Sequence, residues 1–340
     1  MNKTFFAVLG ILFILGILTA FTPRETFNPA DGDYNREYWL QKLASNDPHK
    51  VYEEFKKRNA QAPLDRQHLA THVFGETLFE ELGSDGVSIC DSTFSFGCFH
   101  GFFTYAVSEE GIAIVPEFNA SCVEAFTSLG TGCLHGIGHG IMDYFGPGNV
   151  NAALETCEKD TTQVVPLIGC TSGVFMEYHS PVVISEDSAR LDPRPFDSAN
   201  PYEPCEDVPE RFRTSCYFEL GFWWYQVLGA DYEYMGDLCR QTSNDEARKH
   251  CFLGVGSIAT QVIQAQTIKN DVLKTLRQNC SAAGEGNDRQ LCLSGASWLL
   301  YTEPSTRELA PLLCKGLPPA EEEKCLVDAD FTEGLDDTHL

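Results

Sequence analysis

The stretch that decides the fold runs from Cys133 to Tyr144 and reads CLHGIGHGIMDY. His135 and His139 lie four residues apart, so on a helix both imidazoles project from the same face. The stretch also holds three glycines, Gly136, Gly138 and Gly140. In a helix interior each glycine costs roughly 1 kcal/mol relative to alanine. We therefore expect a helix whose backbone is approached closely by another part of the chain.

Cys133 is the second member of a cysteine pair, and such pairs recur along the chain. Partners are 8 to 13 residues apart, and successive pairs begin mostly 32 to 41 residues apart, which is the period of helical-hairpin repeats. We expect each pair to join the end of an outer helix to the start of an inner one, although spacing alone leaves the connectivity open. The expected pairs are Cys90 and Cys98, Cys122 and Cys133, Cys157 and Cys170, Cys205 and Cys216, Cys239 and Cys251, Cys280 and Cys292, and Cys314 and Cys325.

The second cysteine of each pair opens a segment rich in apolar and small residues. Five of the six such segments from Cys98 to Cys292 begin C-x-x-G, and the one at Cys216 has its glycine later, at Gly221. Residues 65–82 (DRQHLATHVFGETLFEEL) read as one more inner helix without cysteines. The predicted fold is therefore all-α, with about seven disulfide-stapled helical hairpins that form an α/α toroid or, if the ring does not close, a curved α-solenoid.

The domain plan follows from composition. Residues 1–22 carry a long uncharged run, which predicts a signal peptide or an N-terminal membrane anchor, and residues 23–35 read as a linker. Residues 36–325 form a single helical-repeat domain, and residues 326–340 an acidic tail. Within the domain, six prolines at 180–210 forbid a long helix and predict an irregular insertion that acts as a lid over one end.

Charge and cysteine content restrict the partners and the compartment. The formal net charge of −25 over 340 residues disfavours nucleic acid and anionic membrane surfaces, because both would repel the protein. Contact with a membrane is expected only through the N-terminal segment. Fourteen cysteines behind an export-like N-terminus indicate an oxidising, extracytoplasmic location, either secreted or anchored.

Five of the nine histidines recur at matching places in three consecutive inner helices. His100 and His135 each follow the second cysteine of their unit by two residues, and His68 aligns with them. His72 and His139 lie four residues further on. If the repeats stack regularly, the five imidazoles face one side at one level. Imidazoles from rigid elements are typical ligands of a divalent transition metal such as Zn, Fe or Cu, so we predict a metal site.

Nearby residues extend this hypothesis. His179 is a candidate sixth imidazole ligand, and Glu177 a candidate carboxylate ligand in the same segment. Asp143 and Glu76 lie about one turn beyond the histidine pairs, where they could hold the other N–H of an imidazole. The three acids are also the weaker candidates for catalytic acid and base.

The C-x-x-G and HGxGHG helix starts resemble the inner helices of α/α-toroid proteins such as the lanthionine cyclase-like family. That resemblance, over about residues 65–302, implies a central cavity ringed by inner helices, with a metal ion bound by Cys and His. Here the candidate ligands are histidines and the cysteines are paired, so lanthionine chemistry is not implied. The stapled hairpins also resemble secreted Sel1-like solenoids, which are binding proteins.

Three functions remain open from the sequence. The first is an exported metal-binding protein, with metal-dependent catalysis as one expectation, that takes a small molecule, glycan or peptide in a central cavity. The second is a non-enzymatic cell-surface interaction scaffold in which the histidines are incidental. The third is a carbohydrate-active toroid that uses two of the carboxylates as acid and base. Converging histidines favour the first function, and separated histidines favour the second.

Overall fold

The computed structural model describes residues 36–126, 130–162, 168–185, 188–264, 269–302 and 306–329. The predicted signal peptide or anchor, the linker and most of the acidic tail lie outside these residues. Over the part of the chain that is described, no helix is both long and apolar enough to cross a membrane.

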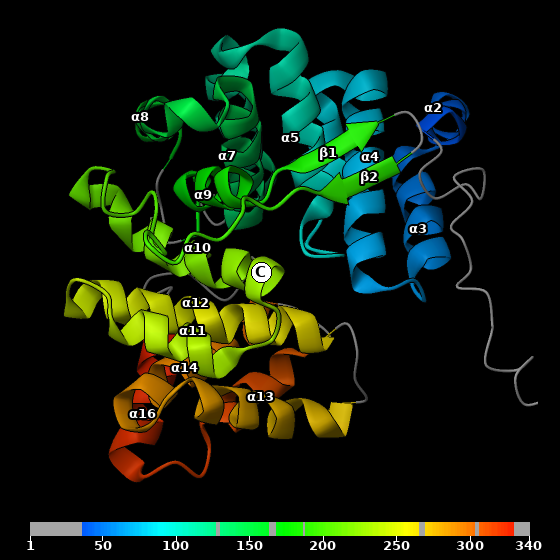
Figure 1. Cartoon of the computed structure of the whole chain (residues 1–340). Helices are drawn as coiled ribbons and strands as arrows, with labels where there is room; N and C mark the ends of the chain where they lie inside the picture. Colours follow the sequence, from blue (N-terminus) through cyan, green and yellow to red (C-terminus); the bar gives the residue numbers. More distant parts are fainter. Residues whose placement is uncertain are drawn as a thin grey trace, which may run out of the picture.

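Inner helices form a curved row in which each packs against the next one in sequence (Figure 1). The curvature brings the two ends of the row together, because His68 of the first inner helix and Trp298 of the last line one cavity. The protein therefore has the all-α helical-repeat fold predicted from its cysteine period. The inner helices are α4 (Leu64–Leu82), α5 (Gly97–Glu110), α7 (Thr131–Phe145), α9 (Cys170–His179), α10 (Glu210–Leu228), α12 (Asp245–Gln264) and α14 (Gly286–Thr302).

Outer helices precede the inner ones and bury one face against them. They are α3 (Pro48–Asn59), α6 (Val115–Phe126), α8 (Val150–Asp160), α11 (Tyr232–Arg240), α13 (Lys269–Ala283) and α15 (Ala310–Cys314). Helix α2 (Arg36–Ser45) packs on α4, and α16 (Pro319–Ala329) packs on α14. Short 3-10 helices complete the connections: η1 (Gly83–Ile89), η2 (Ile112–Ile114), η4 (Pro147–Asn149) and η5 (Arg307–Leu309).

All seven predicted cysteine pairs are disulfides, with Cα atoms 5.4 to 5.8 Å apart. The prediction that the second cysteine opens the inner helix is wrong for α10, α12 and α14, which begin six residues earlier. In α12 the reason is local. The Asn244 side chain accepts a hydrogen bond from the Ala247 backbone N–H, 2.9 Å away, so this cap starts the helix at Asp245, ahead of Cys251.

The proline-rich insertion at 180–210 is less irregular than predicted, because it contains a two-stranded antiparallel hairpin. Strand β1 (Val182–Ser185) pairs with β2 (Ser188–Leu191), and Val182 lies opposite Leu191. The rest of the insertion is held against α10, where the indole N–H groups of Trp223 and Trp224 donate to backbone carbonyls of the insertion. Among the described residues, none of the insertion lines the cavity, and the lid expected over one end of the fold stays a prediction.

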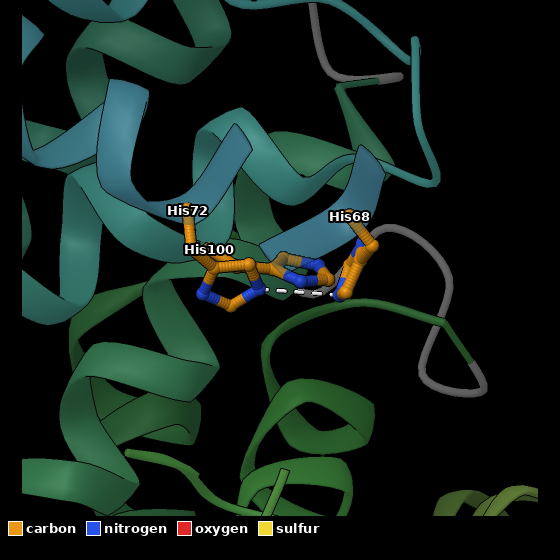
Figure 2. A group of neighbouring side chains, drawn as sticks. All are labelled: His68, His72 and His100. Atoms are coloured by element: carbon orange, nitrogen blue, oxygen red, sulfur yellow. Dashed lines mark hydrogen bonds between the residues drawn. The ribbon is translucent and has the colours of Figure 1, made fainter. Parts of the chain in front are cut away.

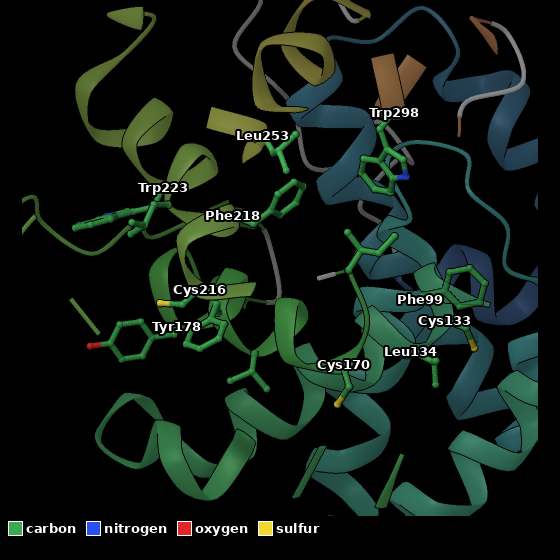
Figure 3. Close-up of a cluster of buried hydrophobic side chains, with 14 of the residues drawn as sticks. Phe99, Cys133, Leu134, Cys170, Tyr178, Cys216, Phe218, Trp223, Leu253 and Trp298 are labelled. Atoms are coloured by element: carbon green, nitrogen blue, oxygen red, sulfur yellow. The ribbon is translucent and has the colours of Figure 1, made fainter. Parts of the chain in front are cut away.

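Large apolar side chains fill the space between successive helices. Figure 3 shows part of this core, where Phe218 of α10, Leu253 of α12 and Trp298 of α14 come together. The Phe218 and Trp298 rings meet edge to face, 6.1 Å apart. The core continues to the other end of the row through Trp39, Phe55 and Phe74.

Glycines bring neighbouring inner helices into backbone contact. A Cβ atom built on Gly101 of α5 would lie 1.9 Å from the His72 carbonyl oxygen of α4. One on Gly173 of α9 would lie 1.9 Å from the carbonyl oxygen of His135 in α7. No side chain fits at such a distance. The glycines of HGxGHG make the same kind of contact, since a Cβ atom on Gly138 would lie 2.0 Å from the Cys170 carbonyl oxygen, which confirms the expected close approach. The contacts occur at the turns that carry the histidines.

Candidate metal centre

The five histidines singled out from the sequence converge on one place. Helix α4 supplies His68 and His72, α5 supplies His100, and α7 supplies His135 and His139. Figure 2 shows His68 and His72 on consecutive turns of α4, with the His100 ring beside them. His72, His100 and His139 are buried, and the other two are partly buried. The glycine contacts between the helix backbones make this convergence possible.

The donor nitrogens have the spacing of metal ligands. The Nε2 atoms of His68 and His72 are 3.1 Å apart, and so are those of His135 and His139. Two imidazole nitrogens bound to one tetrahedral zinc ion are separated by about 3.3 Å, given Zn–N bonds of roughly 2.0 to 2.1 Å. Each i, i+4 pair is therefore arranged to share an ion with little movement.

The other ring nitrogen of three of these histidines is held by the protein. His68 Nδ1 donates to the Phe94 carbonyl oxygen at 2.9 Å, and His139 Nδ1 lies 2.7 Å from Glu177 Oε2. His135 Nδ1 lies 2.7 Å from Ser172 Oγ. The Ser172 hydroxyl already donates to the Gly169 carbonyl, so His135 is the donor and its Nε2 keeps a lone pair for an ion. Such orienting bonds are typical of metal-binding histidines.

His100 lies between the two pairs and differs from the other four. Its ring centre is 5.2 Å from both His68 and His72, 5.1 Å from His135 and 4.1 Å from His139. Both of its ring nitrogens are buried, and neither has a hydrogen-bond partner among the described residues. An unsatisfied buried polar atom costs about 1–3 kcal/mol, so this arrangement implies a partner of another kind.

Burial keeps the cluster uncharged. Desolvation lowers the pKa of all five imidazoles from the usual value, and that of His135 falls to about 3. The neighbouring histidines lower the pKa of His100 and His139 further, because two imidazolium charges would repel each other. At neutral pH the imidazoles are therefore in the form that binds metal.

Glu177 places a carboxyl group behind the cluster. It is 4 % exposed, and burial raises its pKa well above the usual range, while the Val182 backbone hydrogen bond acts in the opposite direction. A buried carboxylate is stable only when an opposite charge or several hydrogen bonds compensate it. A cation on the imidazole nitrogens would supply that charge, with the His139 ring between the two.

A strained turn lies beside the site. Phe94, Ser95 and Phe96 all have positive φ angles, between 56° and 62°, a region that residues with side chains seldom occupy. This conformation directs the Phe94 carbonyl to His68 and places Ser95 and Phe96 in the lining of the adjacent cavity. Strain of this kind persists where the surrounding structure enforces it, and it is common at functional sites.

The cluster opens onto a cavity of about 130 Å³ at the centre of the curved row. One member of each histidine pair lines it, together with His100. The opposite wall is largely apolar and includes Phe218, Phe222 and Trp298, but it also contains the carboxyl group of Glu219. Burial raises the pKa of Glu219 well above the usual range, because desolvation disfavours its charged form. The cavity thus combines nitrogen donors, an apolar wall and one carboxylic acid.

The remaining residues predicted from the sequence lie in other settings. His179 stacks on Trp223, 4.7 Å between ring centres, and is in neither histidine group. Asp143 is on an exposed part of α7, and Glu76 is 3.5 Å from the Arg36 guanidinium with a pKa raised by burial to about 7. Neither acid is the hydrogen-bond partner of His68, His135 or His139. The Nδ1 atoms of these three histidines contact other residues. Glu76, Asp143 and Glu177 are also not among the described residues that line the cavity.

Three functional residues escaped the sequence analysis: Phe94, Ser172 and Glu219. Phe94 acts through its backbone carbonyl, which no side-chain pattern reveals. Ser172 follows the second cysteine of its unit by two residues, the same position as His100 and His135, and this register could have identified it. Glu219 interrupts an otherwise apolar stretch, CYFELGFWW, and a lone acid in such a run is a signal of a buried carboxyl group.

Comparison with protein-family models, curated proteins and solved structures gave no match. The function is therefore inferred from the geometry of the site.

Proposed function

We propose that the chain is an exported metal-binding protein whose ion is held by histidines of α4, α5 and α7. One observation carries the proposal, namely the convergence of five uncharged imidazoles whose donors approach within 4.8 Å of one another in groups of three. Converging histidines are the outcome that favoured a metal site over an interaction scaffold. The orienting bonds from Ser172 and Glu177 and the unpartnered nitrogens of His100 support the same conclusion.

The cavity favours a metal-dependent enzyme over a purely structural metal site. Structural zinc sites are closed by four protein ligands, whereas catalytic sites keep a position open. Here one face of the cluster borders a cavity that could hold a small, largely apolar substrate. A bound ion would supply Lewis-acid polarisation there. On the opposite wall Glu219 would hold a proton, and the aromatic side chains would bind the substrate and exclude water.

Export is supported by the seven disulfides, because such bonds persist in oxidising compartments. Described residues contain no free cysteine. A structure stapled in every unit from Cys90 onward would not form in a reducing cytosol. The proposed route is the N-terminal segment at 1–22, acting as a signal peptide or an anchor.

The test is metal content of the oxidised full-length protein, measured by inductively coupled plasma mass spectrometry after reconstitution with Zn²⁺, Cu²⁺ or Fe²⁺ and removal of excess metal. We expect at least one ion per chain. The double variant His72→Ala/His139→Ala removes one donor from each pair and should retain less than a tenth of this metal. His250→Ala is the matched control, because His250 is buried in α12 and its hydrogen-bond partner among the described residues is Glu246, in the same helix.

Wild-type protein that retains no metal under any of these conditions would contradict the proposal. So would a double variant that is folded, by circular dichroism, and still holds the full amount.

A further inference from the structure

Among the described residues, the five donors fall into two groups rather than one. His68, His72 and His100 form the first group, and His100, His135 and His139 form the second. Within each group the ligand atoms lie within 4.8 Å of one another. Only His100 belongs to both. A single ion with five imidazole ligands would need all the donors in one group.

We propose that the centre holds two metal ions and that the imidazole of His100 bridges them. This inference rests on the proposed metal-binding function and specifies the number of ions. Each ion would have an i, i+4 pair and one nitrogen of His100 as its three protein ligands.

Both nitrogens of His100 are available for this role. They are buried and have no hydrogen-bond partner among the described residues, whereas an ordinary ligand histidine uses its second nitrogen to bond the protein. The centre of the His100 ring lies within 5.2 Å of the ring centres on both sides, so His100 is close to both pairs. With metal–nitrogen bonds of about 2 Å, a bridging imidazole separates the two ions by about 6 Å.

The proton balance is simple. Neutral imidazole has one N–H and one lone pair, so it can bind one ion without change. To bind a second ion His100 loses the remaining N–H proton to solvent, and the resulting imidazolate uses both nitrogens. Two divalent ions in a buried site favour this anionic form, because it offsets part of their positive charge. No oxidant or reductant is required.

The cavity shows where the remaining coordination positions lie. His68, His100 and His135 line it, which is one histidine from each pair plus the bridge. Each ion would have three nitrogen ligands and an open position toward the same cavity. A single small substrate with two oxygen atoms, such as a carboxylate or a vicinal diol, could then contact both ions.

The test uses Cu²⁺ as the probe. The metal-free protein is titrated with Cu²⁺, the bound copper is counted by mass spectrometry, and the electron paramagnetic resonance signal is integrated at low temperature. We expect two ions per chain and a signal well below two spins per chain, because an imidazolate bridge couples the two unpaired electrons antiferromagnetically. Two further variants, His68→Ala/His72→Ala and His135→Ala/His139→Ala, should each retain one ion with a full one-spin signal.

The outcomes separate the two proposals. One ion per chain in the wild type would overturn the two-ion centre while leaving the metal-binding function intact. Two ions with a full two-spin signal would overturn the bridge. No copper at all would overturn the two-ion centre, and the same result with zinc and iron would overturn the metal-binding function as well. The decisive count is made on the wild-type protein, so it does not depend on the variants remaining folded.

Discussion

At the scale of single residues, the centre depends on partners that fix which nitrogen each imidazole presents. Ser172 uses its only proton on Gly169 and therefore accepts from His135. Glu177 lies behind His139 in the same way, but its carboxyl group would add a negative charge once a cation is bound. Both partners thus orient an imidazole ring, but they differ in charge. Substitution can separate the effect of orientation from the effect of charge.

We predict that Glu177→Gln lowers the affinity for zinc by about 10-fold to 100-fold, which is the usual effect of losing a partner of a ligand histidine. The amide oxygen can still accept from His139 Nδ1, so the ring keeps its orientation and only the negative charge is lost. The metal-free protein should be no less stable, because burial already disfavours the Glu177 carboxylate. Competition titration with a zinc-binding dye and thermal unfolding give the two quantities.

Asp288→Asn is the control, since Asp288 is also buried but pairs with Arg248, 2.6 Å away, at the other end of the row. It should destabilise the protein and leave zinc affinity unchanged. Equal zinc affinity in Glu177→Gln and the wild type would mean that Glu177 has only a packing role.

Sequence reasoning located the ligands at this scale but not their partners. The i, i+4 spacing and the position after the second cysteine are local patterns, so His68, His100 and His135 could be aligned without a structure. Ser172 and Glu177 reach the cluster from the next inner helix, 37 and 38 residues away from their histidines. The repeat period predicts which helices are neighbours, but rotamers determine which side chains meet.

At the scale of helices, the glycines set the distances on which the centre depends. The Gly101 contact fixes the separation of α4 and α5, and the Gly173 contact fixes that of α7 and α9. A Cβ atom built on Gly256 would come equally close, 1.8 Å from the Cys292 carbonyl oxygen, between α12 and α14 and away from the histidines. Close packing is therefore a property of the whole row, of which the metal centre uses one part.

We predict that Gly101→Ala weakens metal binding at least 100-fold. Alanine would gain roughly 1 kcal/mol in helix propensity, but the added methyl group would overlap the His72 carbonyl and push α4 away from α5. His100 would then move away from His68 and His72. The expected result is a lower unfolding midpoint and at least a 100-fold weaker affinity for zinc, measured by differential scanning calorimetry and isothermal titration calorimetry.

Two controls distinguish strain at the site from general instability. Gly148→Ala adds a methyl group with no atom within 4 Å and should change neither quantity. Gly256→Ala should lower the unfolding midpoint about as much as Gly101→Ala but spare zinc binding. If Gly256→Ala weakens zinc binding equally, the distance between α4 and α5 is not the cause.

At this scale the sequence predicted which segments are inner helices better than it predicted where each helix begins. The cysteine period and C-x-x-G starts identified the inner helices, because each unit repeats the same packing problem. The starts of α10, α12 and α14 were missed because polar residues precede the cysteine, and in α12 the Asn244 cap begins the helix among them. Prolines at 180–210 excluded helix correctly but gave no signal for the β1–β2 hairpin.

At the scale of the whole molecule, the seven disulfides divide a long chain into similar stapled units. Each inner helix packs mainly on the units before and after it, as in other repeat proteins, so stability is roughly a sum of local terms. The proposed metal centre lies on the first three inner helices, and the units from α10 onward provide the opposite wall of the cavity. Damage in one unit should therefore have local consequences.

We predict that removing either of two disulfides destabilises the protein equally but affects zinc binding differently. Cys122→Ala/Cys133→Ala and Cys280→Ala/Cys292→Ala open loops of nearly equal length, with separations of 11 and 12 residues. In the chain-entropy model each loss costs about 3 kcal/mol. Only the first pair lies at the metal centre, because Cys133 precedes His135 by two residues. It should weaken zinc binding at least 10-fold, and the second should leave it unchanged.

Thermal unfolding and zinc titration of the two variants test how independent the units are. Equal thermal destabilisation with unequal zinc binding is the result expected of a row in which each unit depends on its neighbours. Equal loss of zinc binding in both variants would contradict it, since a change in α14 would then have reached α7 across the cavity or along the row. In that case the wall formed by α10, α12 and α14 would be part of what holds the histidines together.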